Sequence, residues 1–351
     1  LELLTQMEKK DRWKMEKKKN IPFEQLLTEH KAEVDWLIKD WIEEETIVFI
    51  YGRKFSYKTY VALTFMYLCH LGKPLDTHKT KYGKNILYAV TEGRNTMRNR
   101  YEAMKQFYGQ NNNPNSETRF HVYSDDWSWD EAYIDDFVNK YKPFDVFVFD
   151  CLSQSLGGDS LNNDSTARKV YRGLNKIKNE MKATVIVIHH TGKNPTKGMM
   201  GSAVLGNHAD TEIKVDGSKK TITLLKQRNG SLDNMKLGFM PIPIYLGKDS
   251  DDESILNLAI DLDQKKKGLD YESRTILTAL EAFEDKKILK KEVKDATEKL
   301  LYPSGIVNKD KDSYRSMFNR KTEHLIETNL LFIKKIKGKD YYSERPFEES
   351  A

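Results

Sequence analysis

Residues 51–59, Tyr-Gly-Arg-Lys-Phe-Ser-Tyr-Lys-Thr, hold a glycine, a lysine and a threonine at the spacing of a phosphate-binding loop. In such a loop the lysine contacts the outer phosphates of a nucleotide, and the threonine hydroxyl holds Mg²⁺. A tyrosine stands where the second glycine would let the backbone approach the phosphates, so its ring must swing outward or fill the phosphate site. Taken alone, the spacing is as compatible with coincidence as with a site for ATP. The candidate nucleotide-binding residues are Gly52, Ser56, Tyr57, Lys58 and Thr59.

Three further side chains suited to phosphate chemistry end apolar segments. Asp150 closes the run Phe-Asp-Val-Phe-Val-Phe-Asp, at the position of a carboxylate that holds Mg²⁺ through water. Glu92 follows Leu-Tyr-Ala-Val-Thr and could act as general base on an attacking water. His190 ends Val-Ile-Val-Ile-His-His and could donate a hydrogen bond to a terminal phosphate. The ordinary explanations are a turn-forming aspartate, a surface glutamate and a histidine that caps a strand.

Short apolar runs predict the strands that would position these side chains. They alternate with helix-period segments between residues 31 and 262, which indicates an α/β fold with a mainly parallel sheet covered on both faces. Ligands bind at the carboxyl ends of the strands in such sheets, which is where these side chains fall. Residues 211–228 alternate around a glycine-containing turn and predict an antiparallel hairpin. The predicted strands are 46–52, 85–92, 119–124, 146–151 and 184–190. The predicted helices include 58–71 and one whose buried face is Ala167, Val170, Tyr171, Leu174, Ile177 and Met181.

The C-terminal part has a different pattern. Residues 263–270 form a polar linker, and residues 271–351 show three amphipathic helical segments followed by two short strands around Gly338. This order predicts a winged helix-turn-helix domain. Its helix 313–328 and its wing are basic, which suits contacts with DNA phosphates, although a winged helix can also pack between subunits. The candidate DNA-binding residues here are Arg315, Arg320, Lys321, Lys335 and Lys337, with His324, Lys334 and Lys339 beside them.

Composition places the chain among globular proteins without a strong overall charge. A length of 351 residues favours two domains, and a net charge of +5 leaves any nucleic-acid surface to local clusters of lysine and arginine. Residues 1–30 read as a helical extension or linker, without a secretory signal, and no apolar run approaches the roughly 20 residues that span a bilayer. We expect no membrane partner.

The cysteines suggest a cellular compartment, and the first residue suggests that the chain belongs to a longer polypeptide. Cys69 and Cys151 lie in apolar runs, which indicates buried thiols in a cytoplasmic protein, in the host cytoplasm if the chain is viral or plasmid-encoded. The chain starts at Leu1 rather than Met, so we expect it to be the C-terminal part of a longer polypeptide.

The order of the motifs resembles that of the RecA-like ring helicases, most closely the plasmid RepA-type hexameric helicases and their phage relatives. A core of this kind followed by a winged helix also resembles the helicase-like region of phage primase-polymerases. The joint order is far more specific than any single motif. The matching segments are 34–38, 52–59, 83–93, 144–164, 185–194, 201–210 and 224–230.

The resemblance implies a RecA-like P-loop core that binds ATP and Mg²⁺, with Glu92 as catalytic base, Asp150 as the Mg²⁺ acid and His190 as the coupling residue. It also implies that Lys226 and Arg228 reach the γ-phosphate bound to the adjacent subunit of a ring, where such groups contribute about 10³–10⁵-fold in rate. The alternative for both is a solvated hairpin edge.

The resemblance implies a hexameric ring in which two loops face the channel and touch single-stranded DNA. They are residues 157–166 and residues 193–202, with Lys193 and Lys197 as the candidate DNA contacts. A surface loop without a ligand is an equal alternative for both.

Two residues depart from the family pattern. Tyr57 replaces the loop glycine, and Met200 precedes Gly201 where relatives usually have Arg-Gly. We therefore expect weak or conditional ATPase activity. The leading hypothesis is a ring-forming, Mg²⁺-dependent ATPase and helicase module for phage or plasmid replication, which grips single-stranded DNA and is fused to or associated with a primase or polymerase. A non-hydrolysing DNA-binding platform and a filament-forming, recombinase-like ATPase are the alternatives.

Overall fold

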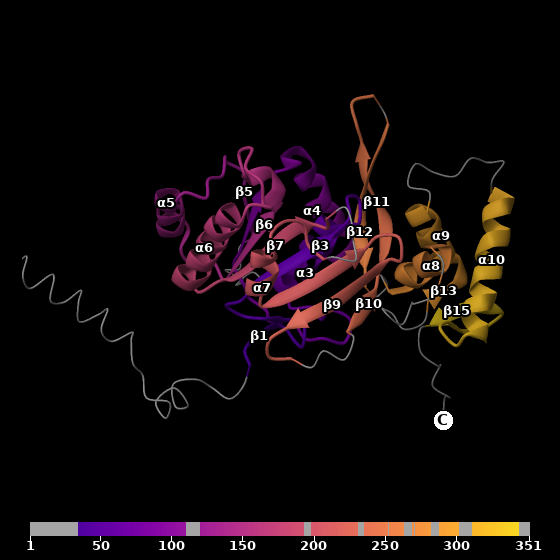
Figure 1. The fold of residues 1–351 in the computed structure, drawn as a ribbon. Coiled ribbons are helices and arrows are strands. Elements are labelled where there is room, and N and C mark those ends of the chain that lie inside the picture. The colour runs from indigo at the N-terminus through magenta and orange to yellow at the C-terminus, as the bar shows by residue number, and fades with distance from the viewer. Residues whose placement is uncertain are drawn as a thin grey trace, which may run out of the picture.

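The computed structural model describes residues 34–109, 120–192, 198–230, 235–251, 253–262, 269, 271–281, 288–301 and 311–343. An eight-stranded sheet forms the centre of the fold, with the strand order β10-β9-β8-β3-β7-β6-β4-β5 (Figure 1). Strands β8, β3, β7, β6, β4 and β5 are parallel, and β9 and β10 extend one edge in antiparallel pairing. The predicted α/β fold with a mainly parallel sheet is therefore confirmed. The strands are β3 (Ile47–Gly52), β4 (Ile86–Val90), β5 (Phe120–Tyr123), β6 (Val146–Asp150), β7 (Thr184–His190), β8 (Thr211–Asp216), β9 (Thr221–Gln227) and β10 (Lys236–Gly238).

Helices cover both faces of this sheet. Alternate residues of β3 show the division, because Val48 and Ile50 belong to one apolar cluster with α3, and Phe49 and Tyr51 belong to the other with α6. Two buried faces explain why the strands read as continuous apolar runs. The helices are α3 (Lys58–Leu71) and α4 (Arg94–Tyr108) on one face, and α5 (Glu131–Tyr141), α6 (Asp164–Met181) and the short α7 (Ala203–His208) on the other.

The buried face of α6 agrees with its sequence period except at one position. Tyr171 is only half-buried and stacks on His208 of α7 at 4.2 Å between ring centroids, whereas Gly173 is buried with the other predicted positions. A Cβ at Gly173 would lie 2.8 Å from the Trp129 ring, so this helix approaches the tryptophan too closely for any side chain.

A long two-stranded hairpin was not anticipated from the sequence. Strands β11 (Met240–Lys248) and β12 (Ser254–Asp261) pair with each other and pack on α4, and they protrude beyond the sheet in Figure 1. Pro241 and Pro243 argue against a strand because proline cannot donate to a ladder. They are tolerated here because β11 is paired on one side only. A second small hairpin, β1 (Trp36–Ile38) with β2 (Ile42–Glu43), precedes β3.

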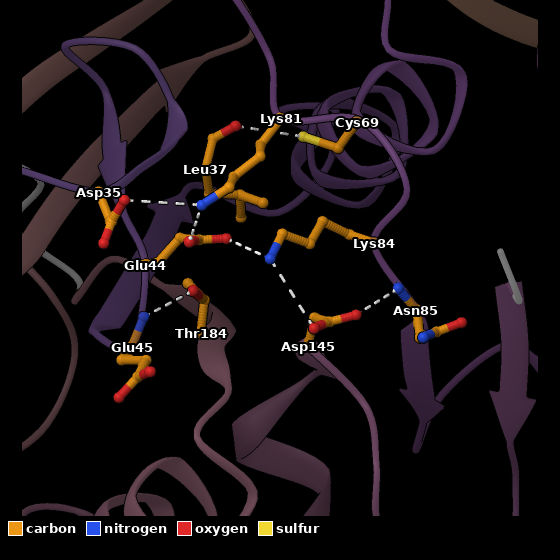
Figure 2. A network of polar contacts seen from close by, with 10 residues as sticks. All are labelled: Asp35, Leu37, Glu44, Glu45, Cys69, Lys81, Lys84, Asn85, Asp145 and Thr184. Atoms are coloured by element: carbon orange, nitrogen blue, oxygen red, sulfur yellow. Dashed lines mark hydrogen bonds and ion pairs between the residues drawn. The ribbon is translucent and has the colours of Figure 1, made fainter.

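The amino-terminal ends of the strands are tied together by a polar network (Figure 2). Glu44 pairs with both Lys81 and Lys84, and the Lys84 ammonium also lies 3.8 Å from an Asp145 oxygen. Asp145 accepts a hydrogen bond from the backbone N–H of Asn85 at 2.8 Å. The network joins the approaches to β3, β4 and β6, so these three strands start in a fixed register.

The C-terminal part has an apolar cluster of its own, with Ile276, Phe318 and Tyr342 among its members. The three predicted helices and the hairpin around Gly338 are present, and a short strand that was not predicted joins that hairpin in a sheet of order β13-β15-β14. A buried ion pair links this part to the core, because the Arg274 guanidinium lies 3.3 Å from Asp261 at the end of β12. The elements are α8 (Tyr271–Glu281), β13 (Ile288–Leu289), α9 (Lys290–Leu301), α10 (Lys311–Glu327), β14 (Phe332–Ile336) and β15 (Lys339–Ser343).

Both cysteines lie in the apolar core. Cys69 and Cys151 are both free and buried, as predicted. Among the helices that the structure describes, none is both long and apolar enough to cross a bilayer.

Candidate nucleotide-binding site

The loop between β3 and α3 has the local geometry of a phosphate cradle. Strand β3 ends at Gly52, five residues turn the chain, and α3 begins at Lys58 with its free N–H groups at the carboxyl edge of the sheet. A Cβ at Gly52 would lie 2.3 Å from the Val215 carbonyl oxygen of β8, so only glycine fits there. The Ser56 hydroxyl is buried and has no hydrogen-bond partner among the described residues.

Tyr57 has a backbone conformation that glycine adopts readily and other residues rarely adopt. It is the N-cap of α3, with φ 70° and ψ 18°, in the left-handed region. Its ring is directed toward β9 and β10, where the Phe239 ring lies edge-on at 5.8 Å and the Lys220 ammonium lies 4.0 Å from the Tyr57 ring centroid. Of the two orientations that the sequence left open, the ring adopts the outward one.

Lys58 is buried at the start of α3 with only 7% of its surface exposed. Its ammonium donates a hydrogen bond to the Arg53 carbonyl at 2.7 Å, across the turn of the loop. Burial lowers the pKa of Lys58, and nearby acidic groups, Asp150 first among them, oppose this shift. The ammonium therefore faces the acidic groups that end the neighbouring strands.

Asp150 and Thr59 meet beside this lysine. Asp150 is 5% exposed and accepts a hydrogen bond from the Tyr88 hydroxyl at 3.0 Å. Burial raises the pKa of Asp150, while hydrogen bonds from Thr59 and Tyr88 act in the opposite direction. A hydroxyl beside a buried carboxylate is a donor set that Mg²⁺ prefers, and a divalent cation would offset the cost of ionising this carboxylate. The residues present therefore fit a Mg²⁺ ion.

Glu92 and His190 complete the group at the same edge. Glu92 is exposed just after β4, and its Oε2 accepts a hydrogen bond from the Cys151 thiol at 3.6 Å. His190 is the register partner of Gly52 in the sheet. Burial lowers the pKa of His190, and the positive charge of Lys58 adds to that shift, so the imidazole is neutral at pH 7 and keeps one N–H to donate. Lys58, Thr59, Asp150, Glu92 and His190 thus converge.

Lys226 and Arg228 do not join this group within one chain. The Lys226 ammonium donates to the Gly206 carbonyl at 2.9 Å, and Arg228 Nε lies 3.0 Å from an Asp210 carboxylate oxygen. In the sheet, Gln227 pairs with Thr211, and Thr211 pairs with Val48 near the start of β3. At the rise of a strand, Val48 lies roughly 13 Å from Gly52, where the loop begins. They lie at the opposite edge of the sheet from Lys58.

Three residues at the site were missed by the sequence reasoning: Tyr88, Arg100 and Cys151. The Arg100 guanidinium lies over the Tyr60 ring at 5.2 Å, and its positive charge opposes the upward shift in the pKa of Asp150. Its Nε is buried without a hydrogen-bond partner among the described residues. Arg100 lies on α4, in the second turn of the helix that follows Glu92, and its sequence context gives no separate signal. Cys151 follows Asp150 directly. Its apolar surroundings in the sequence predicted a buried thiol and gave no sign of the contact with Glu92.

The predicted DNA-binding residues fall into three groups. Arg315 and Arg320 are exposed on α10, and Lys335 and Lys337 are exposed on β14 and the turn after it. Lys321 is more enclosed, with its ammonium 3.9 Å from Glu272 of α8. Lys193 and Lys197 lie outside the described residues, whereas the loop 157–166 leads into α6 through the N-cap Asn163.

The position that departs from the family pattern, Met200, is tied to β7. Its backbone N–H donates to the His190 carbonyl at 2.9 Å, and its carbonyl lies 2.8 Å from Nε2 of His189. A Cβ at Gly201 would lie 2.8 Å from the Leu161 side chain, so these two loops touch.

A family model described as an AAA domain matches residues 14–196. The crystal structure of the RadB recombinase is similar at 18% sequence identity and a TM-score of 0.41, covering 56% of this chain and 87% of that chain. No curated protein sequence matches the chain. Because the family model covers just over half of the 351 residues, the chain belongs to the AAA domain family and carries a P-loop ATPase core.

Proposed function

We propose that this protein is a Mg²⁺-dependent ATPase that acts on single-stranded DNA. One observation carries the proposal: Lys58, Thr59, Asp150, Glu92 and His190 come from α3, β6, β7 and the segment after β4, and they meet at one edge of the sheet. Polyphosphate binding and hydrolysis need a cation, a metal-binding pair, a base and a donor to the terminal phosphate, and this group supplies each of them.

The proposed chemistry assigns one step to each side chain. Lys58 and the amides at the start of α3 bind the β- and γ-phosphates, for which the Lys58 ammonium leaves the Arg53 carbonyl. Thr59 and Asp150 would hold Mg²⁺, which supplies charge neutralisation of those phosphates when bound. Glu92 accepts a proton from the attacking water, and His190 donates its N–H to a γ-phosphate oxygen.

Arg100 supplies a further positive charge in the same chain. Its charge acts on the Asp150 carboxyl, yet its buried Nε has no hydrogen-bond partner among the described residues, and a bound phosphate would supply an acceptor for it.

Lys226 and Arg228 are proposed to act on the nucleotide of an adjacent subunit. Their place at the opposite edge of the sheet leaves no path to the phosphates of their own chain. A closed ring would place the edge of one subunit against the loop of the next, and the resemblance to ring helicases supports this arrangement. The hexamer, the helicase activity, the fused or associated primase-polymerase and the cytoplasmic location in a phage or plasmid system rest on that resemblance.

The C-terminal elements are proposed to form a winged helix that touches DNA phosphates. Exposed Arg315 and Arg320 on α10 support this, as do Lys335 and Lys337 on the wing. Charge reversal at Arg315 and Arg320 should weaken binding to single-stranded DNA and flatten its salt dependence. The same double reversal at the exposed Lys291 and Lys299 of α9 is the matched control, and equal losses in both variants would remove the wing from the proposal.

Phosphate release tests the central claim. With Mg²⁺, ATP and single-stranded DNA, the parent chain should release phosphate, and Glu92→Gln should bind ATP as tightly yet release almost none. Binding of ATP and DNA without any release by the parent chain would instead favour the non-hydrolysing DNA platform. Failure of the parent chain to bind ATP would overturn the proposal.

A further inference from the structure

An aromatic wall stands where a standard phosphate loop has only a glycine. The half-buried Tyr57 ring has Lys220 over one face, at 4.0 Å from the centroid, and Phe239 edge-on at 5.8 Å. Phe239 is buried, whereas part of the Tyr57 ring remains open to solvent. The ring also lies beside α3, because the Tyr60 ring of that helix is tilted against it at 6.4 Å between centroids.

The wall is firmly attached to the loop. A Cβ at Gly217, in the turn between β8 and β9, would lie 2.7 Å from the Ser56 Cα, so the turn packs directly on the loop backbone. Lys220 closes the same turn, and its carbonyl accepts a hydrogen bond from the Phe239 N–H at 2.9 Å. Tyr57, Lys220 and Phe239 therefore keep their relative positions without a ligand.

The strand order places this wall on one side of the loop and the reactive groups on the other. Asp150 and His190 end β6 and β7, and Glu92 follows β4. These three strands lie on one side of β3, whereas β8 and β9 lie on the other. A triphosphate whose terminal phosphate meets Glu92 and His190 must extend across the start of α3. Its nucleoside end then leaves toward β8 and β9, where the Tyr57 ring stands.

We propose that Tyr57 contacts the nucleobase of the bound nucleoside triphosphate, with Lys220 and Phe239 as positioning residues that fix the ring. The inference rests on the proposed nucleotide binding and deepens it. An aromatic face gives a base a stacking surface, and a cation on the opposite face of the ring holds its orientation. The tyrosine in place of glycine then serves as a base platform, and the open backbone of the cradle is retained through its left-handed conformation.

Comparing ATP with inorganic tripolyphosphate isolates the base contact. Dissociation constants for both ligands with Mg²⁺, measured by calorimetry on the full chain, should show that the parent prefers ATP. Tyr57→Gly should lower the ratio of ATP affinity to tripolyphosphate affinity by about tenfold, the scale of one base–aromatic stack. Tyr57→Phe keeps the ring and should keep the ratio. Lys220→Ala should lower the ratio by a smaller factor, because the ring loses its fixed orientation.

The outcomes separate this inference from the proposed function. An unchanged ratio in Tyr57→Gly, with both ligands still bound, would overturn the base platform and leave the phosphate site intact. Equal affinity of the parent chain for both ligands would do the same. Failure of the parent chain to bind either ligand would overturn the proposed function itself.

Discussion

A left-handed backbone at a residue with a large side chain sets this phosphate loop apart. At Tyr57 the cost of φ 70° is about 1–2 kcal/mol, because the Cβ crowds the following carbonyl. Contacts of the ring with Phe239 and the Lys220 ammonium help to offset that cost. The sequence reasoning identified the substitution but not the orientation of the ring, because Phe239 and Lys220 are distant in the chain and only the folded sheet brings them to the loop.

A pair of variants separates the backbone cost from the ring contacts. Tyr57→Ala and Tyr57→Gly both remove the ring, but only alanine keeps a Cβ at a left-handed position. Tyr57→Gly should therefore be more stable than Tyr57→Ala by about 1 kcal/mol in urea unfolding. Tyr57→Phe is the control and should stay close to the parent. An alanine variant as stable as the glycine variant would contradict a left-handed backbone at this position.

At the scale of elements, the predictable part was the set of parallel strands and the helix α3. Apolar runs identify β3 to β7 because both faces of the sheet are covered, and the acidic and imidazole groups fall at the ends of those strands. The β11–β12 hairpin was not predictable, since Pro241 and Pro243 conceal a strand that pairs on one side only. Arg100 was also not predicted as a site residue, because the packing of α4 against α3, rather than sequence spacing, brings it near Asp150.

Strand β7 should give the core a measurable pH dependence. His189 is fully buried, its Nε2 donates to the Met200 carbonyl at 2.8 Å, and burial lowers its pKa to about 4. The unfolded chain takes up this proton near pH 6.5 and the folded chain only near pH 4, so stability is lost as the pH falls through that window. The loss attributable to His189 approaches about 3 kcal/mol.

The His189→Gln variant tests this assignment. Glutamine can still donate to the Met200 carbonyl but does not titrate, so its unfolding free energy should fall less than that of the parent between pH 6.5 and pH 4. Urea unfolding at several pH values measures the unfolding free energy of both proteins. The contributions of the other titrating groups cancel in the difference between the parent and the variant. Parallel pH profiles for the two proteins would show that His189 is not the titrating group.

The turn between β8 and β9 should be sensitive to a single methyl group. Gly217→Ala would place its Cβ 2.7 Å from the Ser56 Cα, so the turn and the phosphate loop must move apart. We expect the unfolding free energy to fall by about 1–3 kcal/mol and ATP affinity to fall with it. Gly192→Ala is the matched control, because no atom of the described residues lies within 4 Å of its Cβ and its φ is not positive. Equal stability of the two variants would show that the turn does not bear on the loop.

At the scale of the whole molecule, the sheet separates two sets of charged groups. The loop, Asp150 and His190 lie at the carboxyl edge, while Lys226 and Arg228 lie at the amino-terminal edge, where Arg228 pairs with Asp210. The separation follows from the antiparallel hairpin predicted for residues 211–228, because β8 runs parallel to β3 and β9 returns antiparallel to β8. A single chain therefore holds an incomplete set of groups for transition-state stabilisation if Arg228 takes part in hydrolysis.

Mixing two inactive variants tests whether Arg228 completes a neighbouring site. Glu92→Gln lacks the base but keeps Arg228, and Arg228→Gln lacks the guanidinium but keeps a whole loop, so each alone should lose about 10³-fold or more in phosphate release. In mixed assemblies, some sites of the Arg228→Gln subunits face an intact Arg228 from a Glu92→Gln subunit. Phosphate release by the mixture should therefore rise well above the sum of the rates of the two variants measured separately. The double variant mixed with Arg228→Gln is the control, since it offers no guanidinium to any site. Arg228 also pairs with Asp210, so thermal unfolding of each variant must first establish that the fold is retained. A mixture no more active than its components would assign Arg228 to that ion pair alone, because an arginine that serves only Asp210 gives nothing to the adjacent subunit.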